Sequence, residues 1–489
     1  MRTTYSASRW PGRAAVAMSL SLLLGAVPGC GGDGSSMEPP NDAMMPGTTF
    51  TPDEVLDDLE ERTFRFFWET ANADNGLVPD RYPTPSFSSI AAIGFGLTAY
   101  GIGVEQGYVS REDARARVLT TLRFLSDAPQ GEGEQGTTGF NGFFYHFLDM
   151  DTGERFQDVE LSTVDTSLLL AGVLFCQSYF DGDDPNEAEI RQLAEDIYDR
   201  VDWTWAQARP PAISHGWKPE DGFLPFDWLG YNEAMVVYIL ALGSPTHPVE
   251  PEAWDLWTSP YDQQWGVFDG QEHLFFPPLF GHQYSHVWID FRGIQDAFMA
   301  EKGIDYFENS RRAVLAQQAY ATENPEGWNG YGEKVWGLTA CDGPADVELE
   351  FGGETRTFHS YSARGPHQTD DGTIAPTAAA SSIAFAPDEA IAATVELRNR
   401  FGENIYDQYG FLDAFNPSFE FDAPVVGGRV VPGFGWVDTD YLGIDQGPIL
   451  AMLANYRSEL VWQVMQRNPH IRTGLERAGF TGGWLEAEK

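Results

Sequence analysis

Six segments of this chain carry apolar or small residues on nearly every face that a helix would present. Such a helix must be surrounded by other helices, because none of its faces is suited to water. The apolar segments alternate along the chain with charged segments whose apolar residues recur at helical spacing. The apolar segments are 88–104, 162–180, 232–243, 284–300, 373–386 and 445–456, and the amphipathic segments are 53–70, 110–126, 186–206, 304–322, 387–400 and 457–475.

This alternation predicts an all-α fold, an (α/α)6 toroid in which each of six inner helices is followed or preceded by an outer helix. The outer partner between Leu242 and Gly281 is poorly marked, because only the short "EAWDLW" has a suitable pattern there. Two segments with Gly-Gly pairs, 345–363 and 423–436, predict small β-hairpins on rim loops. Residues 51–489 contain no second linker, so we expect them to form one domain.

The first residues have the pattern of an export signal. Three arginines precede an apolar run at 14–27, which is too short to span a bilayer and ends in "VPGC" at Cys30. Pro28 is unusual inside a lipid-attachment motif. We predict a signal peptide at 1–29, a lipidated Cys30 and a flexible tether at 30–50. The mature protein would be a secreted lipoprotein, anchored in the periplasm or on the cell surface.

The formal net charge of −43 argues against nucleic acid or anionic polymers as partners. It suits a neutral substrate, or simply solubility in a saline setting. Cys176 and Cys341 are too few for a disulfide scaffold or a zinc cluster, and their spacing does not decide whether they pair. We expect a monomer that meets the membrane only through its lipid anchor.

Three of the predicted inner helices open with a carboxylate. Asp165 follows a Ser-Thr capping pair, Glu233 follows Asn232, and Asp445 comes shortly before Pro448. If the inner helices run in the same direction, their N-termini gather at one end and the three acids line one pocket. The alternative for each acid is a plain cap, which stabilises its helix by about 0.3–1 kcal/mol.

Aromatic side chains accompany two of these acids. Trp228 and Tyr231 lie near Glu233 in the sequence, and Trp436 lies near Asp445. Such rings can stack on sugars, although they fit core packing equally. Paired carboxylates in an aromatic cleft suggest glycoside hydrolysis, which needs one protonated and one ionised acid. We predict Glu233 as the general acid, with a pKa raised by burial, and Asp445 as an ionised base in a more polar loop.

The segment "GHQYSHVWIDFRG" spaces His282, His286 and Asp290 by four residues, as in some metal sites. It lacks the glutamate of the metalloprotease signature, so we favour sugar contacts from His282, Asp290 and Arg292 and a core position for His286. The substrate-binding residues that we predict are Trp217, Tyr231, Asn232, His282, Asp290, Arg292, Asp370, Trp436 and Asp440.

Other ligand sites are less well supported. Asp370 and Asp371 precede another inner helix and could be substrate contacts or caps. Asp438, Asp440 and Asp445 make calcium conceivable, but their spacing is not that of an EF-hand loop. Neither a lysine-containing phosphate loop nor a "GxSxG" nucleophile is present in the sequence. We therefore predict no cofactor and assign no metal ligands.

Several motifs also resemble a known family. "GWKPEDGFLPFDWLGYNEAM", "PLFGHQYSHVWIDFRGIQDAFM", "DDGTIAPTAAASSI" and "GWVDTDYLGIDQGPILAML" are similar to the glucoamylase-like bacterial family, in particular to the endo-β-1,2-glucanases of glycoside hydrolase family 144. The resemblance extends from about residue 55 to the C-terminus. It implies that 51–489 is an (α/α)6 catalytic domain that hydrolyses β-1,2-glucan to sophoro-oligosaccharides with inversion. Glu233 and Asp445 would then be catalytic acids, with a third at or near Asp165.

Two kinds of alternative remain open. An exo-acting, sophorose-releasing hydrolase or a transglycosylase could be built on the same ring. A surface glycan-binding lipoprotein would bind β-glucan without cleaving it. Polysaccharide lyases also use such toroids, but they need uronic acid substrates and usually cationic clefts, which the negative charge argues against.

Overall fold

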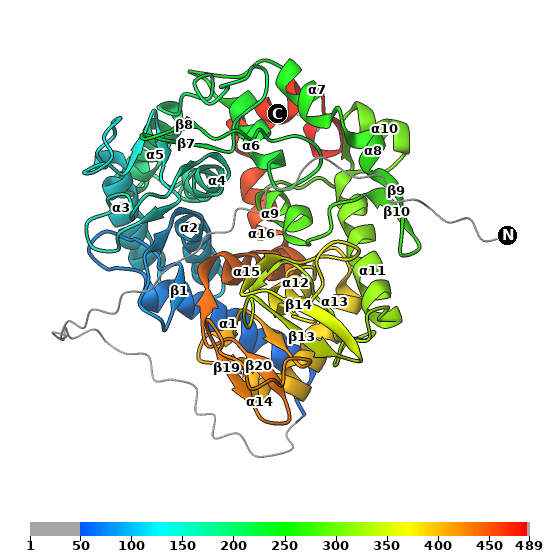
Figure 1. Ribbon diagram of the computed structural model, residues 1–489. Helices are drawn as coiled ribbons and strands as arrows, with labels where there is room; N and C mark the ends of the chain where they lie inside the picture. Colours follow the sequence, from blue (N-terminus) through cyan, green and yellow to red (C-terminus); the bar gives the residue numbers. More distant parts are fainter. Residues whose placement is uncertain (1–48, 487–489) are drawn as a thin grey trace. The chain divides into compact units, whose positions relative to one another are not determined.

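The inner helices lie at the six apolar segments. The computed structural model describes residues 49–486, so the predicted signal peptide, Cys30 and most of the tether lie outside the described residues. In Figure 1 the inner helices surround the middle of the drawing. They are α2 (Ile90–Glu105), α4 (Thr163–Tyr179), α6 (Met235–Gly243), α9 (Phe280–Trp288), α12 (Pro376–Ala380) and α15 (Gly443–Ser458).

Longer amphipathic helices cover the inner ones from outside. The first, α1, begins with a capping box in which Thr51 and Glu54 bond each other's backbone N–H groups, as its sequence favours. The outer helices are α1 (Pro52–Thr70), α3 (Arg111–Asp127), α5 (Pro185–Asp199), α11 (Tyr306–Glu323), α13 (Pro387–Glu396) and α17 (Pro469–Arg477). Shorter helices are α7 (Glu252–Thr258), α8 (Tyr261–Gln264), α10 (Ala297–Lys302), α14 (Gly402–Ile405) and α16 (Leu460–Met465).

Contacts run from one inner helix to the next. Helix α2 packs on α4, α4 on α6, α6 on α9, α12 on α15, and α15 on α2. Between α9 and α12, the Gln283 side-chain amide donates to the Ala378 carbonyl at 2.9 Å and to Ser382 Oγ at 3.0 Å. The fold is therefore helix-rich and consistent with an α/α toroid.

The crossing of α2 and α4 depends on two glycines. A Cβ placed on Gly94 would lie 2.2 Å from the Leu168 carbonyl oxygen, and one placed on Gly172 would lie 2.1 Å from the Gly94 carbonyl oxygen. Because both obstacles are backbone atoms, no side-chain rotation could relieve them. The small residues in these two segments thus bring the helices into direct backbone contact.

The outer partner of α6 comes from the far end of the chain. Between 242 and 281 the only complete helices of the described chain are the short α7 and α8, and α6 packs instead on α17, where Gly243 and Gly474 each face backbone of the other helix. The predicted single helix at 457–475 is wrong. It divides into α16 and α17 because Asn468 caps a new helix that begins at Pro469.

Two predicted inner helices are shorter than the apolar pattern suggested. The segment 284–300 was expected to be helical, but α9 ends at Trp288 because Ile289 is extended and Asp290 turns its carboxylate onto the Arg292 N–H. The segment 373–386 contains only the five residues of α12, followed by turns. In both segments, apolar composition reflected burial and not helix length.

The sheets within the described residues are small. The hairpin predicted at 345–363 is confirmed, with Val347 opposite Phe358 and Phe351 opposite Glu354 across the Gly352–Gly353 turn. The segment 423–436 contributes to a three-stranded sheet. No helix in the described part of the chain combines the length and apolarity needed to cross a membrane.

Two sheets have three strands: β7 (Gly216–Lys218) pairs with β6 (Leu161–Ser162) and β8 (Gly222–Phe223), and β20 (Gly435–Val437) pairs with β18 (Phe415–Asn416) and β19 (Arg429–Val431). The other strands form pairs. They are β1 (Arg81–Tyr82) with β21 (Tyr441–Leu442), β2 (Ser88–Ser89) with β5 (Phe147–Leu148), β3 (Gly139–Phe140) with β4 (Phe143–Phe144), β9 (Trp265–Phe268) with β10 (Gln271–Leu274), β11 (Ile294–Gln295) with β22 (Thr481–Gly482), β12 (Ala340–Asp342) with β15 (Tyr361–Ala363), β13 (Val347–Phe351) with β14 (Glu354–Phe358), and β16 (Tyr406–Asp407) with β17 (Gly410–Phe411).

Candidate active site

Three predicted acids stand at the N-terminal ends of inner helices. Asp165 lies in the first turn of α4, Asp445 in the first turn of α15, and Glu233 two residues before α6 begins. Asp165 and Asp445 are buried, at 6% and 4% exposure, and Glu233 is partly buried.

The Tyr284 phenol of α9 lies among these acids. Burial raises its pKa well above the usual value, and the negative charges of Asp445, Glu233 and Asp165 raise it further, together with the Tyr361 phenol. The three acids therefore all act electrostatically on one side chain. Sequence reasoning missed Tyr284 as a site residue, because its position in an apolar helix resembles that of a core tyrosine.

Glu233 is held in place by its backbone. Ser285 Oγ of α9 donates to the Glu233 carbonyl at 3.2 Å and accepts from the Val236 N–H at 3.0 Å, which fixes the turn before α6. The carboxyl Oε2 is buried without a hydrogen-bond partner among the described residues. Burial raises the pKa of Glu233 to about 7, with a backbone hydrogen bond opposing the rise and Asp165 adding to it.

Asp165 is paired with a histidine that the sequence analysis missed. The Ser162 hydroxyl lies 2.5 Å from one Asp165 oxygen, and His146 Nε2 lies 3.5 Å from the same oxygen. The other ring nitrogen of His146 lies 3.0 Å from Glu160 Oε1. Burial works against the imidazolium, but Asp165 and Glu160 overcome it and raise the pKa of His146 to about 9. His146 stands between short strands, where no helical pattern marked it.

Asp445 differs from its prediction. It was expected to stay ionised in a polar loop, yet it lies buried in α15, and burial raises its pKa to about 7. The nearby Asp342, Asp80 and Asp438 add to this rise, whereas a hydrogen bond with Asp413 lowers it. Both Glu233 and Asp445 thus titrate near neutral pH, so pKa does not distinguish the acid from the base.

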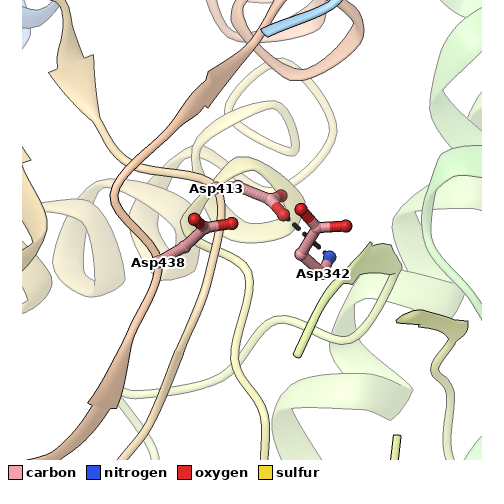
Figure 2. Close-up of side chains that lie close together, drawn as sticks. All are labelled: Asp342, Asp413 and Asp438. Atoms are coloured by element: carbon pink, nitrogen blue, oxygen red, sulfur yellow. Dashed lines mark hydrogen bonds between the residues drawn. The ribbon is translucent and has the colours of Figure 1, made fainter. Parts of the chain in front are cut away.

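Asp445 borders a group of aspartates from distant parts of the chain. Figure 2 shows Asp342, Asp413 and Asp438 with their carboxyls turned toward one another. The Asp342 N–H donates to Asp413 Oδ2 at 2.8 Å. Asp440 adjoins this group: it accepts the Thr84 N–H at 2.9 Å and lies 4.0 Å from Arg81. Asp342 and Asp413 were missed because Asp342 ends a short strand and Asp413 lies in a loop, and no periodic pattern marks either position.

Two exposed tyrosines border the same region. Tyr361 is 58% exposed and pairs with Asp342 between β15 and β12. Tyr82 is 36% exposed and follows Arg81 in β1. Exposed rings beside carboxylates are suited to stacking on sugars while the acids act on the linkage.

Asp290 and Arg292 lie at the other end of the inner helices, which corrects their prediction as sugar contacts. They form an ion pair at 2.8 Å, and Arg292 also pairs at 2.7 Å with Glu459, the residue directly after α15. Because Asp445 is in the first turn of α15, about 20 Å of helix separates the two regions.

The remaining predicted contacts are mainly structural. His282 and Tyr231 are fully buried: His282 Nε2 lies 3.1 Å from the Phe276 carbonyl, and the Tyr231 ring stacks on Tyr306. Their apolar surroundings exclude sugar contact. Asn232 caps its own turn by accepting the Ala234 N–H at 3.0 Å.

Trp436, Asp370 and Trp217 are also engaged within the protein. Trp436 is fully buried and donates to the Gly427 carbonyl at 2.8 Å. Asp370 accepts the hydroxyls of two tyrosines, at 2.9 and 2.7 Å. Trp217 packs against two aromatic rings with centroids 5.2 and 5.7 Å away. His286, expected in the core, is fully buried.

Buried carboxyls that titrate near neutrality, gathered at the mouths of inner helices beside exposed tyrosines, form a centre of the glycoside hydrolase type. Residues 225–469 match the family model described as "Putative glucoamylase", and the chain belongs to this family. The resemblance found in the sequence is thereby confirmed.

Known proteins similar to this chain act on β-1,2-linked glucans. An exo β-1,2-glucooligosaccharide sophorohydrolase (non-reducing end) of Parabacteroides distasonis is 28% identical over 89% of the chain, which spans only 60% of that relative's length. An endo-β-1,2-glucanase of Chitinophaga pinensis, solved with sophorotriose and glucose, is 28% identical, with a TM-score of 0.75 over 89% of this chain and 100% of that one.

A solved Bacteroides uniformis protein described as a glucoamylase is 30% identical, with a TM-score of 0.77 over 90% of this chain and 100% of that one. The word glucoamylase comes from the family description and does not assign an α-glucan substrate.

Proposed function

We propose that the protein is a glycoside hydrolase that cleaves β-1,2-glucan, with its inner helices closed into an (α/α)6 toroid around the site. The observation that carries the proposal is the gathering of Glu233, Asp165 and Asp445 around Tyr284 at the N-terminal ends of inner helices. The substrate class is supported by the similarity to enzymes described as acting on β-1,2-glucans.

Glu233 acts as the general acid in this proposal. With a pKa of about 7 its carboxyl is largely protonated in mildly acidic solution, and its unpartnered Oε2 is free to donate to the glycosidic oxygen. As the bond to the anomeric carbon breaks, the leaving sugar takes this proton.

Asp445 acts as the base. Its carboxylate accepts the proton of the attacking water, directly or through a sugar hydroxyl, and water enters from the face opposite the leaving group. The product therefore has the inverted configuration. The Asp165 carboxylate adds to the rise in the pKa of Glu233, which favours the protonated form of the acid.

The test is reducing-end release from linear β-1,2-, β-1,3-, β-1,4- and α-1,4-glucans. We expect cleavage of the β-1,2-glucan, loss of at least about a thousandfold in kcat for Glu233→Gln, and little change for the exposed Glu348→Gln. Wild-type turnover in Glu233→Gln would contradict the assignment. Binding of β-1,2-glucan without the release of new reducing ends would identify a glycan-binding protein instead.

The product profile decides between the two modes of cleavage. An endo enzyme yields mixed oligosaccharides early, whereas an exo enzyme releases sophorose from the first turnovers. A transglycosylase would form larger or cyclic products without a matching rise in reducing ends. The anomeric signal of the first product, followed by NMR, tests inversion.

We also propose that the mature protein is anchored through Cys30. The basis is the sequence of the leader, which ends in "VPGC". We expect labelled palmitate to be incorporated into the wild-type protein in cells and not into Cys30→Ser, with the Ser variant moving to the soluble fraction. Equal labelling of both proteins would rule out this anchor.

A further inference from the structure

Three aspartates from three separate parts of the chain meet beside Asp445. Asp342 ends β12, Asp413 precedes β18, and Asp438 follows β20. One oxygen from each carboxylate lies within 4.8 Å of the other two (Figure 2). Asp413 and Asp438 are each only 2% exposed, so neither charge is relieved by bulk water.

Each carboxylate uses one oxygen to fix its orientation. Asp342 Oδ2 accepts from Arg81 Nη1 at 2.7 Å, and Asp413 Oδ2 accepts the Asp342 N–H at 2.8 Å. Asp438 Oδ1 accepts the N–H groups of Thr439 and Asp440. Outer partners of this kind commonly orient carboxylates that bind metal ions.

The opposite oxygens lack protein partners. Asp413 Oδ1 and Asp438 Oδ2 are buried and have no hydrogen-bond partner among the described residues. Asp445, which lies outside the group and is 4% exposed, likewise has a buried Oδ2 without a donor, and its carboxyl hydrogen-bonds that of Asp413 only when one of the two is protonated. Buried acceptors without donors are costly, so their convergence indicates a missing positive partner.

Arg81 supplies only part of the positive charge that this group needs. It forms ion pairs with Asp342 at 2.7 Å, Asp80 at 3.3 Å and Asp440 at 4.0 Å. Within residues 49–486, no ion pair of a cationic side chain with Asp413 or Asp438 is found.

We infer that Asp342, Asp413 and Asp438 bind a divalent cation that prefers oxygen ligands, with Ca²⁺ as the favoured ion. Ca²⁺ takes oxygens at about 2.3–2.6 Å, so two ligand oxygens on one ion can be as much as about 5 Å apart, and the observed separations fall within this range. Three carboxylates leave further coordination positions for water.

The inference is independent of the proposed function, because it rests on the arrangement of carboxylates. Sequence analysis considered Asp438, Asp440 and Asp445 for calcium. The structure instead joins Asp438 to two aspartates that are remote in sequence, and turns Asp440 toward Thr84 and Arg81.

The experiment measures Ca²⁺ binding to full-length protein that has been treated with a chelator and dialysed. Equilibrium dialysis with radioactive Ca²⁺ should show one tight site per chain above a weak background. At a hundredfold excess of Ca²⁺ over its Kd and constant ionic strength, the melting temperature should rise by about 3 °C or more.

Asp413→Asn and Asp438→Asn test the ligands. We expect each to weaken Ca²⁺ binding by about tenfold or more and to abolish the rise in melting temperature. Asp422→Asn is the matched control, because it removes the same charge from an exposed position and should bind like the wild type. Mg²⁺ tests the preference, since its shorter bonds suit this spacing less well.

Absence of a stoichiometric site in the wild type would overturn the inference, and this measurement stands even if both variants fail to fold. Equal Ca²⁺ responses in the wild type, Asp413→Asn and Asp438→Asn would also overturn it. If the asparagine variants were more stable than the wild type and Ca²⁺ had no effect, shared protons would hold the carboxyls together instead.

Discussion

Protonation of the Glu233 carboxyl affects both catalysis and the stability of the folded protein. Its carboxyl is a potential acid because burial raises its pKa to about 7, and the same burial makes the ionised form unfavourable in the folded protein. An elevated carboxyl pKa means that the folded state binds the proton more tightly than the unfolded state. Stability from this group is therefore greatest at low pH and is lost as pH rises from the unfolded pKa through about 7.

We expect kcat/KM on β-1,2-glucan to fall tenfold per pH unit above about pH 7, as the acid loses its proton. Glu233→Gln cannot ionise, so above pH 8 it should be more stable than the wild type by roughly 2 kcal/mol, with little difference at pH 5. Urea unfolding at the two pH values measures this effect. If Glu233→Gln were less stable than the wild type at both pH values, the raised pKa of Glu233 would be contradicted.

The stability that His146 contributes also falls as pH rises, but over a higher pH range. Its pKa of about 9 exceeds the unfolded value, so the stabilisation from its ion pairs is complete below about pH 6.5 and disappears as pH rises through 9. His146→Gln should therefore lower the free energy of unfolding by about 2 kcal/mol at pH 6 and by much less at pH 10. The exposed His247→Gln is the control and should show neither effect. A pH-independent loss in His146→Gln would mean that packing, not charge, matters there.

Among the elements, α2 and α4 make close contact through their backbones. We expect Gly172→Ala to destabilise the protein by about 2 kcal/mol or more, because the new methyl group would lie 2.1 Å from a carbonyl oxygen that cannot move independently. Gly332→Ala, where an added methyl meets nothing within 4 Å, should be nearly neutral. Comparable melting temperatures for the two variants would contradict this account of the crossing.

Apolar pattern predicted the inner elements, because a helix buried on all sides must lack charge. It did not predict their ends. Helix α9 stops where Asp290 turns back onto Arg292, and α12 is short, and both outcomes depend on neighbours remote in sequence. The partner of α6 was unpredictable for the same reason, since Gly243 and Gly474 meet only in the folded chain.

The candidate site was likewise predictable from the sequence only in part. Asp165, Glu233 and Asp445 were found because helix starts mark them, and the structure brings all three around Tyr284. His146 and Asp413 lie in loops, where no periodicity indicates which way a side chain points. Other predicted contacts failed because an aromatic or histidine close in sequence to an acid can face the core, as His282 does.

In the whole molecule, residues near both ends of the domain complete the helical assembly. Helix α1 packs on α15, and α17 packs on α6. We expect a chain that ends at Asn468 to be insoluble or to expose apolar surface, because α6 would lose its outer cover. A chain that ends at Phe480 keeps α17 and should fold. Dye binding and circular dichroism distinguish the outcomes, and a folded protein ending at Asn468 would contradict the role of α17.

The pairing of α6 with α17 also constrains the order of events during synthesis. The middle of the polypeptide leaves the ribosome long before α17 exists, so α6 can pack on α4 but its outer side stays uncovered until the last residues have emerged. Packing of the helical domain is therefore incomplete until translation of α17 has ended. That delay would suit the exported lipoprotein that we propose, because such a chain passes through a translocation channel before it folds.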